Sequence, residues 1–388
     1  MSDLVRTQLA ADADPLVVKV GTRVLTLPSG ELDEARVQAL SEQLVAIGAG
    51  VDRRVVLVSS GAVGAGIGRL GLGQRPTDLA GLQAAAAVGQ SRLIEAYNQA
   101  LSKHGRHAAQ VLLTSDDLND RRRYLNVRNT LRSLFEFGAI PIVNENDTVR
   151  TDELSRNIAD NDHLAAMLAN QLHAPLLVIL TDVDGLFDGR PELDDSELIE
   201  MVDVVNEGAM AKVEEGAAKP GANLSKGGMS SKLRAAQVAT TAGGSVVLAN
   251  GRRDNILVDL MAGKPLGTLI PGQGGLVSAR KRWIGWAAHP QGELTLDDGA
   301  VRAVREQGSS LLSVGLTAVS GEFEKGDAVS LCDAQGQEFA RGLTNYSADD
   351  LRKIMGQPTD RIAEILGRMP YAEAVHRNDL TLLGRVAL

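Results

Sequence analysis

Two lysines stand at positions where a positive charge needs a partner. Lys19 lies inside the apolar run Leu16–Val20, just before Gly21, and a buried ammonium group is costly unless an anion pairs with it. Lys232 lies in the first turn of a predicted helix, where a cation opposes the positive end of the helix dipole. Both positions favour a nearby anion such as a phosphate group. The alternative for Lys19 is that its ammonium group extends to solvent at the strand end.

The segment that ends in Lys232 has the composition of an anion-binding turn. It reads Lys226-Gly227-Gly228-Met229-Ser230-Ser231-Lys232. Two glycines let backbone N–H groups turn toward an anion, and the helix that follows adds its dipole. The serine hydroxyls can bind phosphate oxygens or cap the helix. The alternative is a flexible Gly-Gly loop with a serine cap, and the residue order is not that of a Walker A loop.

Four short apolar runs end in small, hydroxylic or acidic residues. Runs of this length are typical of strands buried on both faces of a parallel sheet, and ligands bind beyond the carboxyl ends of such strands. The sequence therefore predicts one sheet edge that carries the chemistry. The runs and the residues that follow them are Leu16–Val20 followed by Gly21-Thr22, Val55–Val58 followed by Ser59-Ser60-Gly61, Ile140–Val143 followed by Asn144-Glu145-Asn146-Asp147, and Leu176–Leu180 followed by Thr181-Asp182.

The acidic groups of this edge can hold a cation or orient one. Asp147 follows a predicted strand and can hold an ammonium group, and Asp182 can meet a nucleotide. Asn161 and Asp162 belong to an Asp-Asn-Asp-His stretch that also reads as an ordinary helix N-terminus. His163 has no identifiable partner, so we interpret it as a bystander and not as a general base.

A glycine-rich segment, 59–66, follows the second predicted strand. Its amides can cradle a carboxylate or phosphate, and its glycines can equally serve the close packing of a helix on the sheet. Gly66 to Gly71 is a literal GxGxxG. It is not a dinucleotide fingerprint, because it does not open directly after a strand and no strand-end acid follows about 20 residues later.

Composition narrows the class of protein. The chain has 388 residues and a formal net charge of -9, which disfavours a nucleic-acid or membrane surface as the main partner. Cys332 is the single cysteine, so neither an intrachain disulfide nor a cysteine metal site is expected. No signal-peptide pattern and no apolar run of membrane-spanning length is present, which predicts a cytoplasmic protein.

Strand and helix patterns alternate up to about residue 285, which predicts a three-layer αβα sandwich with a mainly parallel central sheet. Helical spacing recurs at Val37–Ile47, Ala84–Leu101, Leu164–Leu172 and from Met229 onward. Residues 191–225 are acidic and then glycine-rich, as in a mobile excursion. Short predicted strands then follow at Glu293–Leu296, Leu311–Val319, Ala328–Cys332 and Glu338–Leu343, which predicts a small β-rich domain.

Taken together, these segments resemble the amino acid kinase superfamily. The motifs in chain order are VVKVGTRVLT, VVLVSSGAVGAG, AAVGQSRLIE, IPIVNENDTV, DNDHLAAMLA, LTDVDGLF, GGMSSK, KRWIGWA and GSSLL. They are most similar to the glutamate kinases, which convert L-glutamate to L-glutamyl 5-phosphate with ATP in the first step of proline biosynthesis. The tail resembles a PUA domain. The resemblance divides the chain into an N-terminal tail (1–14), a kinase domain (15–285), a linker (286–292), a PUA domain (293–375) and a C-terminal tail (376–388).

The resemblance also implies roles for individual residues. Lys19 and Lys232 would neutralise charge on the transferring phosphoryl group, and Asp162 would orient them as the third catalytic residue. The substrate-binding residues would be Ser60, Asp147 and Asn161, with Asn144 lining the pocket. The ATP-binding residues would be Lys19, Thr181, Asp182, Lys226, Gly227, Gly228, Met229, Ser230, Ser231 and Lys232. No side chain is assigned to a metal, because Mg²⁺ would be held largely by phosphates. Lys226 departs from the family, where a small hydroxylic residue is common.

The chemistry agrees with this assignment. The side-chain carboxylate of glutamate has a pKa of about 4.3 and needs no general base at neutral pH, so positioning and charge stabilisation suffice. The resemblance further implies inhibition by proline, a glutamyl phosphate reductase as the next enzyme, and a homo-oligomer, expected to be a tetramer.

Two alternatives remain at this stage. One is an amino acid kinase for aspartate or N-acetylglutamate; Asp147 disfavours the acetylated substrate, which lacks an ammonium group. The other is an RNA-binding protein, because PUA domains often bind RNA. From Gly292 onward the chain has 10 basic and 15 acidic residues, which is a poor electrostatic match for RNA. We expect the tail to regulate activity or to help assembly instead.

Overall fold

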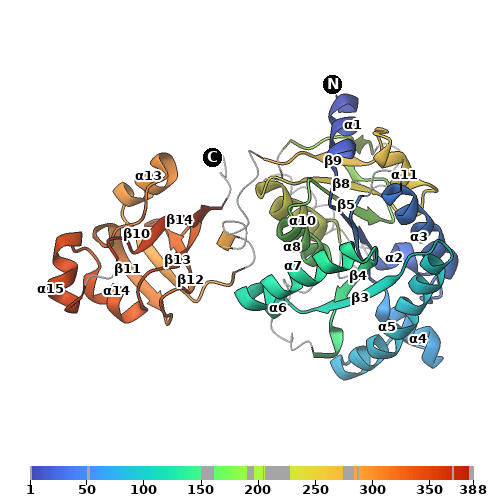
Figure 1. Cartoon of the computed structure of the whole chain (residues 1–388), viewed down its shortest axis with the longest axis horizontal. Coiled ribbons are helices and arrows are strands. Elements are labelled where there is room, and N and C mark those ends of the chain that lie inside the picture. The colour runs from blue at the N-terminus through green and yellow to red at the C-terminus, as the bar shows by residue number, and fades with distance from the viewer. Residues whose placement is uncertain are drawn as a thin grey trace. The chain divides into compact units, whose positions relative to one another are not determined.

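The computed structural model describes residues 2–49, 53–149, 161–189, 196–203, 205, 228–273, 284–285, 288–368 and 371–383. The chain divides into two compact units: one comprises residues 1–118 and 122–276, and the other comprises residues 277–388 with the short segment 119–121. Figure 1 shows them as a larger unit, coloured blue to yellow, and a smaller unit, coloured orange to red. Among the described residues, no helix is both long and apolar enough to cross a membrane.

A seven-stranded sheet organises the larger unit, with strand order β3-β4-β2-β1-β5-β8-β9. Its strands are β1 (Leu16–Val20), β2 (Val55–Val58), β3 (Ala108–Leu113), β4 (Ile140–Glu145), β5 (Leu176–Thr181), β8 (Ser245–Asn250) and β9 (Thr268–Ile270). Neighbouring strands are parallel except for β8 and β9. The predicted α/β architecture with a mainly parallel sheet is therefore confirmed, and four of its strands lie where the apolar runs predicted them.

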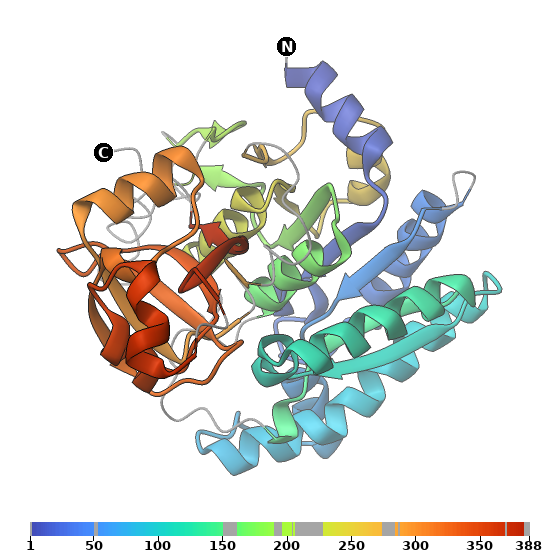
Figure 2. The ribbon, with the colours of Figure 1, turned by 60° about the vertical axis from the view of Figure 1, so that its left-hand side comes forward.

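Helices cover both faces of this sheet (Figure 2). They are α1 (Ser2–Asp12), α2 (Thr22–Leu25), α3 (Glu34–Gly48), α4 (Ala62–Leu70), α5 (Leu79–Ser102), α6 (Ser115–Asn119), α7 (Arg121–Glu136), the 3-10 turn η1 (Asp147–Val149), α8 (Asn161–Leu172), α10 (Met229–Thr241) and α11 (Ile256–Met261). Two short strands, β6 (Leu186–Phe187) and β7 (Leu198–Ile199), pair antiparallel in a separate small sheet.

The alternation of side chains along β1 decides where its lysine points. Leu16, Val18 and Val20 pack into the core formed with α3, α5 and α11. Side chains alternate between the faces of a strand, so Lys19 lies on the opposite face, against which α8 packs. The helix that carries Asp162 therefore meets the strand that carries Lys19.

Glycines bring α4 and α5 into close contact. A Cβ atom on Gly66 would lie 1.8 Å from the carbonyl oxygen of Ala85, and one on Gly89 would lie 1.8 Å from that of Ala62. The segment 59–66 thus serves helix packing, one of its two interpretations. Gly61, with φ of +100°, makes the turn into α4, a conformation that favours glycine.

The N-terminal residues differ from the expected tail at 1–14. They form the helix α1, whose Arg6 is 5% exposed. The guanidinium group of Arg6 donates to the carbonyl oxygens of Leu266, Glu200 and Gly267 at 2.8, 2.8 and 3.0 Å. One long-range side chain therefore docks a helix whose polar composition gave no sign of a packed face.

The smaller unit has a five-stranded sheet of order β11-β10-β12-β13-β14 around its own core. Its elements are β10 (Gly292–Leu296), α13 (Asp298–Gln307), the 3-10 turn η3 (Ser313–Gly315), β11 (Leu316–Gly321), β12 (Ala328–Cys332), β13 (Glu338–Thr344), α14 (Ala348–Ile354), η4 (Thr359–Arg361), α15 (Ile362–Leu366) and β14 (Val375–Leu382).

Two predictions for this unit were wrong in detail. The strand expected at Leu311–Val319 starts only at Leu316, because a 3-10 turn precedes it. The expected tail at 376–388 begins inside β14, which pairs with β13 at the sheet edge. The polar stretch His376-Arg377-Asn378-Asp379 hid this strand, since an edge strand exposes much of its surface.

Candidate active site

Three buried charged side chains meet at the carboxyl edge of the larger sheet. Asp162 is fully buried, and its Oδ1 lies 2.5 Å from Nζ of Lys19. Its Oδ2 lies 3.2 Å from Nζ of Lys232. The two lysines are only 3% and 5% exposed. Residues from distant parts of the sequence therefore share one carboxylate, and the cluster carries one net positive charge.

The neighbouring charges decide the protonation state of Asp162. Burial by itself raises the pKa of this carboxyl group. The charges of Lys19 and Lys232, together with hydrogen bonds from Lys19 and Ser231, outweigh that effect and lower the pKa to about 2. Asp162 is therefore ionised at neutral pH and neutralises one of the two ammonium groups.

The start of α10 brings Lys232 to this carboxylate. Gly228 is the N-cap of the helix and no side chain caps it. The hydroxyl of Ser231 donates to Oδ2 of Asp162 at 2.8 Å and also lies 3.1 Å from the Gly228 carbonyl oxygen. Ser231 thus contacts the catalytic candidates and does not act as the cap. Asp162 is the anion that the unfavourable position of Lys232 required.

A chain of amide and hydroxyl groups extends from this cluster. Asn161, next to Asp162 in α8, donates through Nδ2 to Oγ of Ser60 and to Oδ1 of Asn144, both at 3.0 Å. Nδ2 of Asn144 donates in turn to Oε1 of Gln90 at 2.8 Å. Three of the four substrate-binding candidates are thus connected directly. These side chains come from β4, α8, α5 and the turn after β2.

Further polar groups follow β5 at the same edge. Thr181 is buried, and its hydroxyl donates to Oδ1 of Asp182 at 3.1 Å. Oδ2 of Asp182 accepts from Arg23 in α2 at 3.1 Å. Burial raises the pKa of Asp182, but the hydrogen bonds and charge of Arg23 contribute to a net lowering. Gly21 donates its N–H to the carbonyl oxygen of Leu180 at 3.0 Å, which ties the turn after β1 to the end of β5.

The remaining candidates are placed as follows. Asp147 lies half-buried in η1, three residues beyond Asn144 on the same connection. Met229 and Ser230 form the first turn of α10. Lys226 and Gly227 lie outside the described residues, as does most of the 191–225 segment. Among the residues that the structure does describe, no three acidic, histidine or cysteine side chains are grouped as metal ligands would be.

Sequence reasoning missed two contributors to this edge, Gln90 and Arg23. Gln90 is 8% exposed on α5. The available signal was a polar residue at helical spacing from Ala86 and Leu93, both of which are buried, since a core position on an amphipathic helix is normally apolar. Arg23 gave no signal, because its partner Asp182 is distant in sequence.

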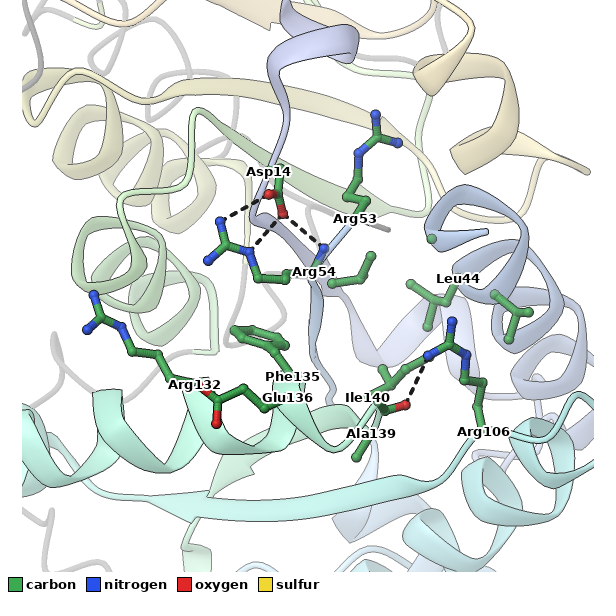
Figure 3. A pocket seen from close by; sticks show the side chains of 14 residues that line it. Asp14, Leu44, Arg53, Arg54, Arg106, Arg132, Phe135, Glu136, Ala139 and Ile140 are labelled. Carbon is green, nitrogen blue, oxygen red and sulfur yellow. Dashed lines mark hydrogen bonds and ion pairs between the residues drawn. The ribbon is translucent and has the colours of Figure 1, made fainter. Parts of the chain in front are cut away.

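A cavity of about 490 Å³ opens at the other edge of the sheet, where β2 and β4 begin (Figure 3). Arg54 holds both carboxylate oxygens of Asp14 at 3.0 Å. Arg53 donates to the carbonyl oxygens of Ile47 and Ala10, and Arg106 donates to that of Gly138. Arg53 and Arg106 satisfy carbonyl groups around the ends of helices, and Arg54 pairs with Asp14, so the geometry gives all three a structural role.

The arrangement at the carboxyl edge suits the transfer of an anionic group. Two amines and a helix N-terminus can face a polyphosphate, and one positive charge is left after Asp162 is counted. The neighbouring amide network can hold a small polar substrate. The described residues around this network include no histidine–carboxylate pair for general base catalysis.

Comparisons with known sequences point the same way. Residues 14–250 match the amino acid kinase family, and residues 292–366 match the PUA domain. Glutamate 5-kinase from Rhodopirellula baltica is 47% identical over 378 residues, covering 97% of this chain and 96% of that protein. Glutamate 5-kinase from Pseudomonas aeruginosa is 48% identical over 371 residues, covering 95% and 97%. Carbamate kinase from Giardia lamblia bound to AMP-PNP is a structural neighbour, 19% identical with a TM-score of 0.46, covering 68% of this chain and 100% of that one.

Proposed function

Because the chain belongs to the amino acid kinase family, and is a kinase, we propose that it transfers the γ-phosphoryl group of Mg²⁺–ATP to the side-chain carboxylate of L-glutamate. The observation that carries the proposal is the convergence of Lys19 and Lys232 on Asp162 at the carboxyl edge of the sheet. The near full-length similarity to glutamate 5-kinases supports glutamate over other carboxylates.

The proposed reaction needs no proton transfer to begin. The ionised side-chain carboxylate of glutamate attacks the γ-phosphorus, a carboxyl oxygen–phosphorus bond forms, and the bond to the β-phosphate oxygen breaks. L-Glutamyl 5-phosphate and ADP leave. Lys19 and Lys232 stabilise the charge on the transferring group, and Asp162 holds the two amines in register.

The nucleotide-binding and glutamate-binding roles belong to residues at the same edge of the sheet. Thr181, Asp182 and the segment from Lys226 to Lys232 bind the nucleotide, whose phosphates carry the magnesium ion. Ser60, Asn144, Asp147 and Asn161 bind glutamate. The amide network supports the choice of Ser60, Asn144 and Asn161, whereas Asp147 is assigned from its place beyond β4 and from the family resemblance.

The direct test compares three acceptors with the purified full-length chain. ADP release is measured with glutamate, aspartate and N-acetylglutamate, and the acyl phosphate is trapped with hydroxylamine. We expect the highest kcat/KM for glutamate. A higher value for either other acceptor would assign the chain to a different amino acid kinase.

The proposal extends to the pathway, the regulation and the assembly of the chain. We propose that the product enters proline biosynthesis in the cytoplasm, that a glutamyl phosphate reductase consumes it, that free proline inhibits the kinase, and that the chain forms a homo-oligomer, a tetramer. The family resemblance supports all four. Addition of proline should lower the rate of ADP release with glutamate. In a separate measurement, light scattering of the protein as it elutes from a sizing column should give the mass of four chains.

A further inference from the structure

Gln90 has a buried donor that no group in the described structure satisfies. Oε1 accepts from Asn144 at 2.8 Å, whereas Nε2 is buried without a hydrogen-bond partner. At the other end of the network, Oδ1 of Asn161 is also buried without a partner among the described residues. Burying such groups without a partner is unfavourable, and a ligand of matching polarity removes that cost.

A backbone group fixes which amide atoms are donors. The N–H of Glu145 can only donate, and it donates to Oδ1 of Asn144 at 2.9 Å. Nδ2 of Asn144 is therefore the atom that faces Gln90, so the Gln90 atom that meets it must be Oε1. The group of Asn161 that meets Oδ1 of Asn144 must be Nδ2. Nε2 of Gln90 is therefore a donor and Oδ1 of Asn161 an acceptor, and both are buried without a partner among the described residues.

We propose that Gln90 is a specificity-determining residue that donates through Nε2 to the α-carboxylate of the bound amino acid, while Oδ1 of Asn161 accepts from its ammonium group. The inference rests on the proposed function. A free amino acid presents both a carboxylate and an ammonium group, which match the two unpaired atoms in polarity. Both atoms are enclosed, so a small shift of the side chains around them accompanies binding.

The order of the network selects the α-carboxylate. Asn161 adjoins Asp162 and its two lysines, where phosphoryl transfer takes place. Gln90 lies two hydrogen bonds farther along, beyond Asn144. The carboxylate that stays unphosphorylated therefore meets Gln90. A donor amide at that end strengthens binding without drawing charge from the attacking carboxylate.

The substitution Gln90→Glu isolates the free atom. The introduced carboxylate can still accept from Asn144 with one oxygen, and its other oxygen replaces the donor by a negative charge. We expect KM for glutamate to rise at least about tenfold, because a charged hydrogen bond becomes a repulsion. KM for ATP should change little. Gln99→Glu, on the exposed face of the same helix, makes the same change in net charge and should leave both KM values near those of the parent chain.

A second substrate separates a direct contact from a structural effect. Isoglutamine keeps the side-chain carboxylate and the ammonium group of glutamate but has an amide in place of the α-carboxylate. Its amide can donate to the carboxylate introduced by Gln90→Glu. The preference for glutamate over isoglutamine, measured as the ratio of kcat/KM values, should therefore fall at least about tenfold in this variant. An unchanged ratio overturns the contact, since a structural defect affects both substrates alike.

Two controls keep the outcomes distinct. If Gln90→Glu does not fold, Gln90→Met, which removes the donor at similar volume, should also lower the glutamate-to-isoglutamine ratio, and an unchanged ratio there again overturns the inference. Parent enzyme that phosphorylates glutamate while these ratios stay constant refutes the role of Gln90 alone. Parent enzyme that does not phosphorylate glutamate refutes the proposed function.

Discussion

Replacing Asp162 by asparagine tests the charged cluster at its centre. The substitution keeps the shape of the side chain, removes its negative charge and replaces one acceptor oxygen by an NH2 donor. Lys19 and Lys232, 3% and 5% exposed, are then two buried cations that have lost the carboxylate they share. The carboxylate contacts them at 2.5 and 3.2 Å, so no rearrangement short of moving β1 or α10 restores both interactions.

The size of the expected loss of stability follows from the burial of the two lysines. Removal of one partner from a buried ion pair costs about 3–5 kcal/mol, and here two cations lose the same partner. In a folding unit of this size, each 1 kcal/mol lowers Tm by about 2–4 °C. We therefore expect Asp162→Asn to lower Tm of the kinase unit by roughly 6–20 °C. ATP should recover part of the loss, because its phosphates supply negative charge to the same amines.

The assay is thermal unfolding with and without ATP, and the matched control is Asp254→Asn. Asp254 is 92% exposed and lies 3.7 Å from Arg36, a surface pair worth at most about 1 kcal/mol. If Asp162→Asn lowers Tm no more than this control does, the cluster is not the buried electrostatic centre that its geometry indicates. If ATP stabilises the variant less than the parent chain, the amines do not face the phosphates.

Three further predictions concern the same unit. Lys232→Met should lower kcat at least about 100-fold, measured by ADP release at saturating substrates, and an unchanged kcat would remove Lys232 from the reaction. Asp162 has a folded-state pKa of about 2 against an ordinary 3.8, so about 2 kcal/mol of stabilisation is present above about pH 4 and is lost as the pH falls through 2; the difference in free energy of unfolding in urea between parent and Asp162→Asn should therefore narrow by about that amount in acid, and a constant difference would contradict this. Gly89→Ala places a Cβ atom 1.8 Å from a backbone oxygen, whereas Gly73→Ala meets nothing within 4 Å; urea unfolding should show a loss of at least about 2 kcal/mol for the first and almost none for the second, and equal losses would refute the close packing of α4 on α5.

The strands that carry the site could be predicted because the residue types within each strand indicate whether it is buried. Val55–Val58 is apolar at every position and buried at every position, so composition alone identifies a central strand. The edge strand β3 was missed, since its residues are mostly half-exposed and alternate less clearly. The strand β9 was missed too; it has only three residues and is antiparallel to β8.

The site itself was predictable to the extent that each residue violated a local rule. Lys19 in a buried strand and Lys232 in a first helical turn are both unfavourable by themselves, and each pointed to an anion. That one protein carboxylate, Asp162, would satisfy both could not be read from either segment, because Asp162 is also a normal helix N-terminal residue. The pairing depends on which face of β1 meets α8, and the tertiary fold sets that face.

In the proposed reaction, the carboxylate between the two lysines allows both amines to be in place before a phosphate binds. Two ammonium groups placed together in a buried pocket repel each other, and each alone would favour an orientation toward solvent. Asp162 removes this repulsion, and its low pKa keeps it ionised over the whole neutral range. One unit of positive charge then remains, which the proposed reaction would use on the transferring phosphoryl group. A site built from two lysines without the carboxylate would have to order both side chains when ATP binds. The free energy of that ordering would lower the affinity for ATP.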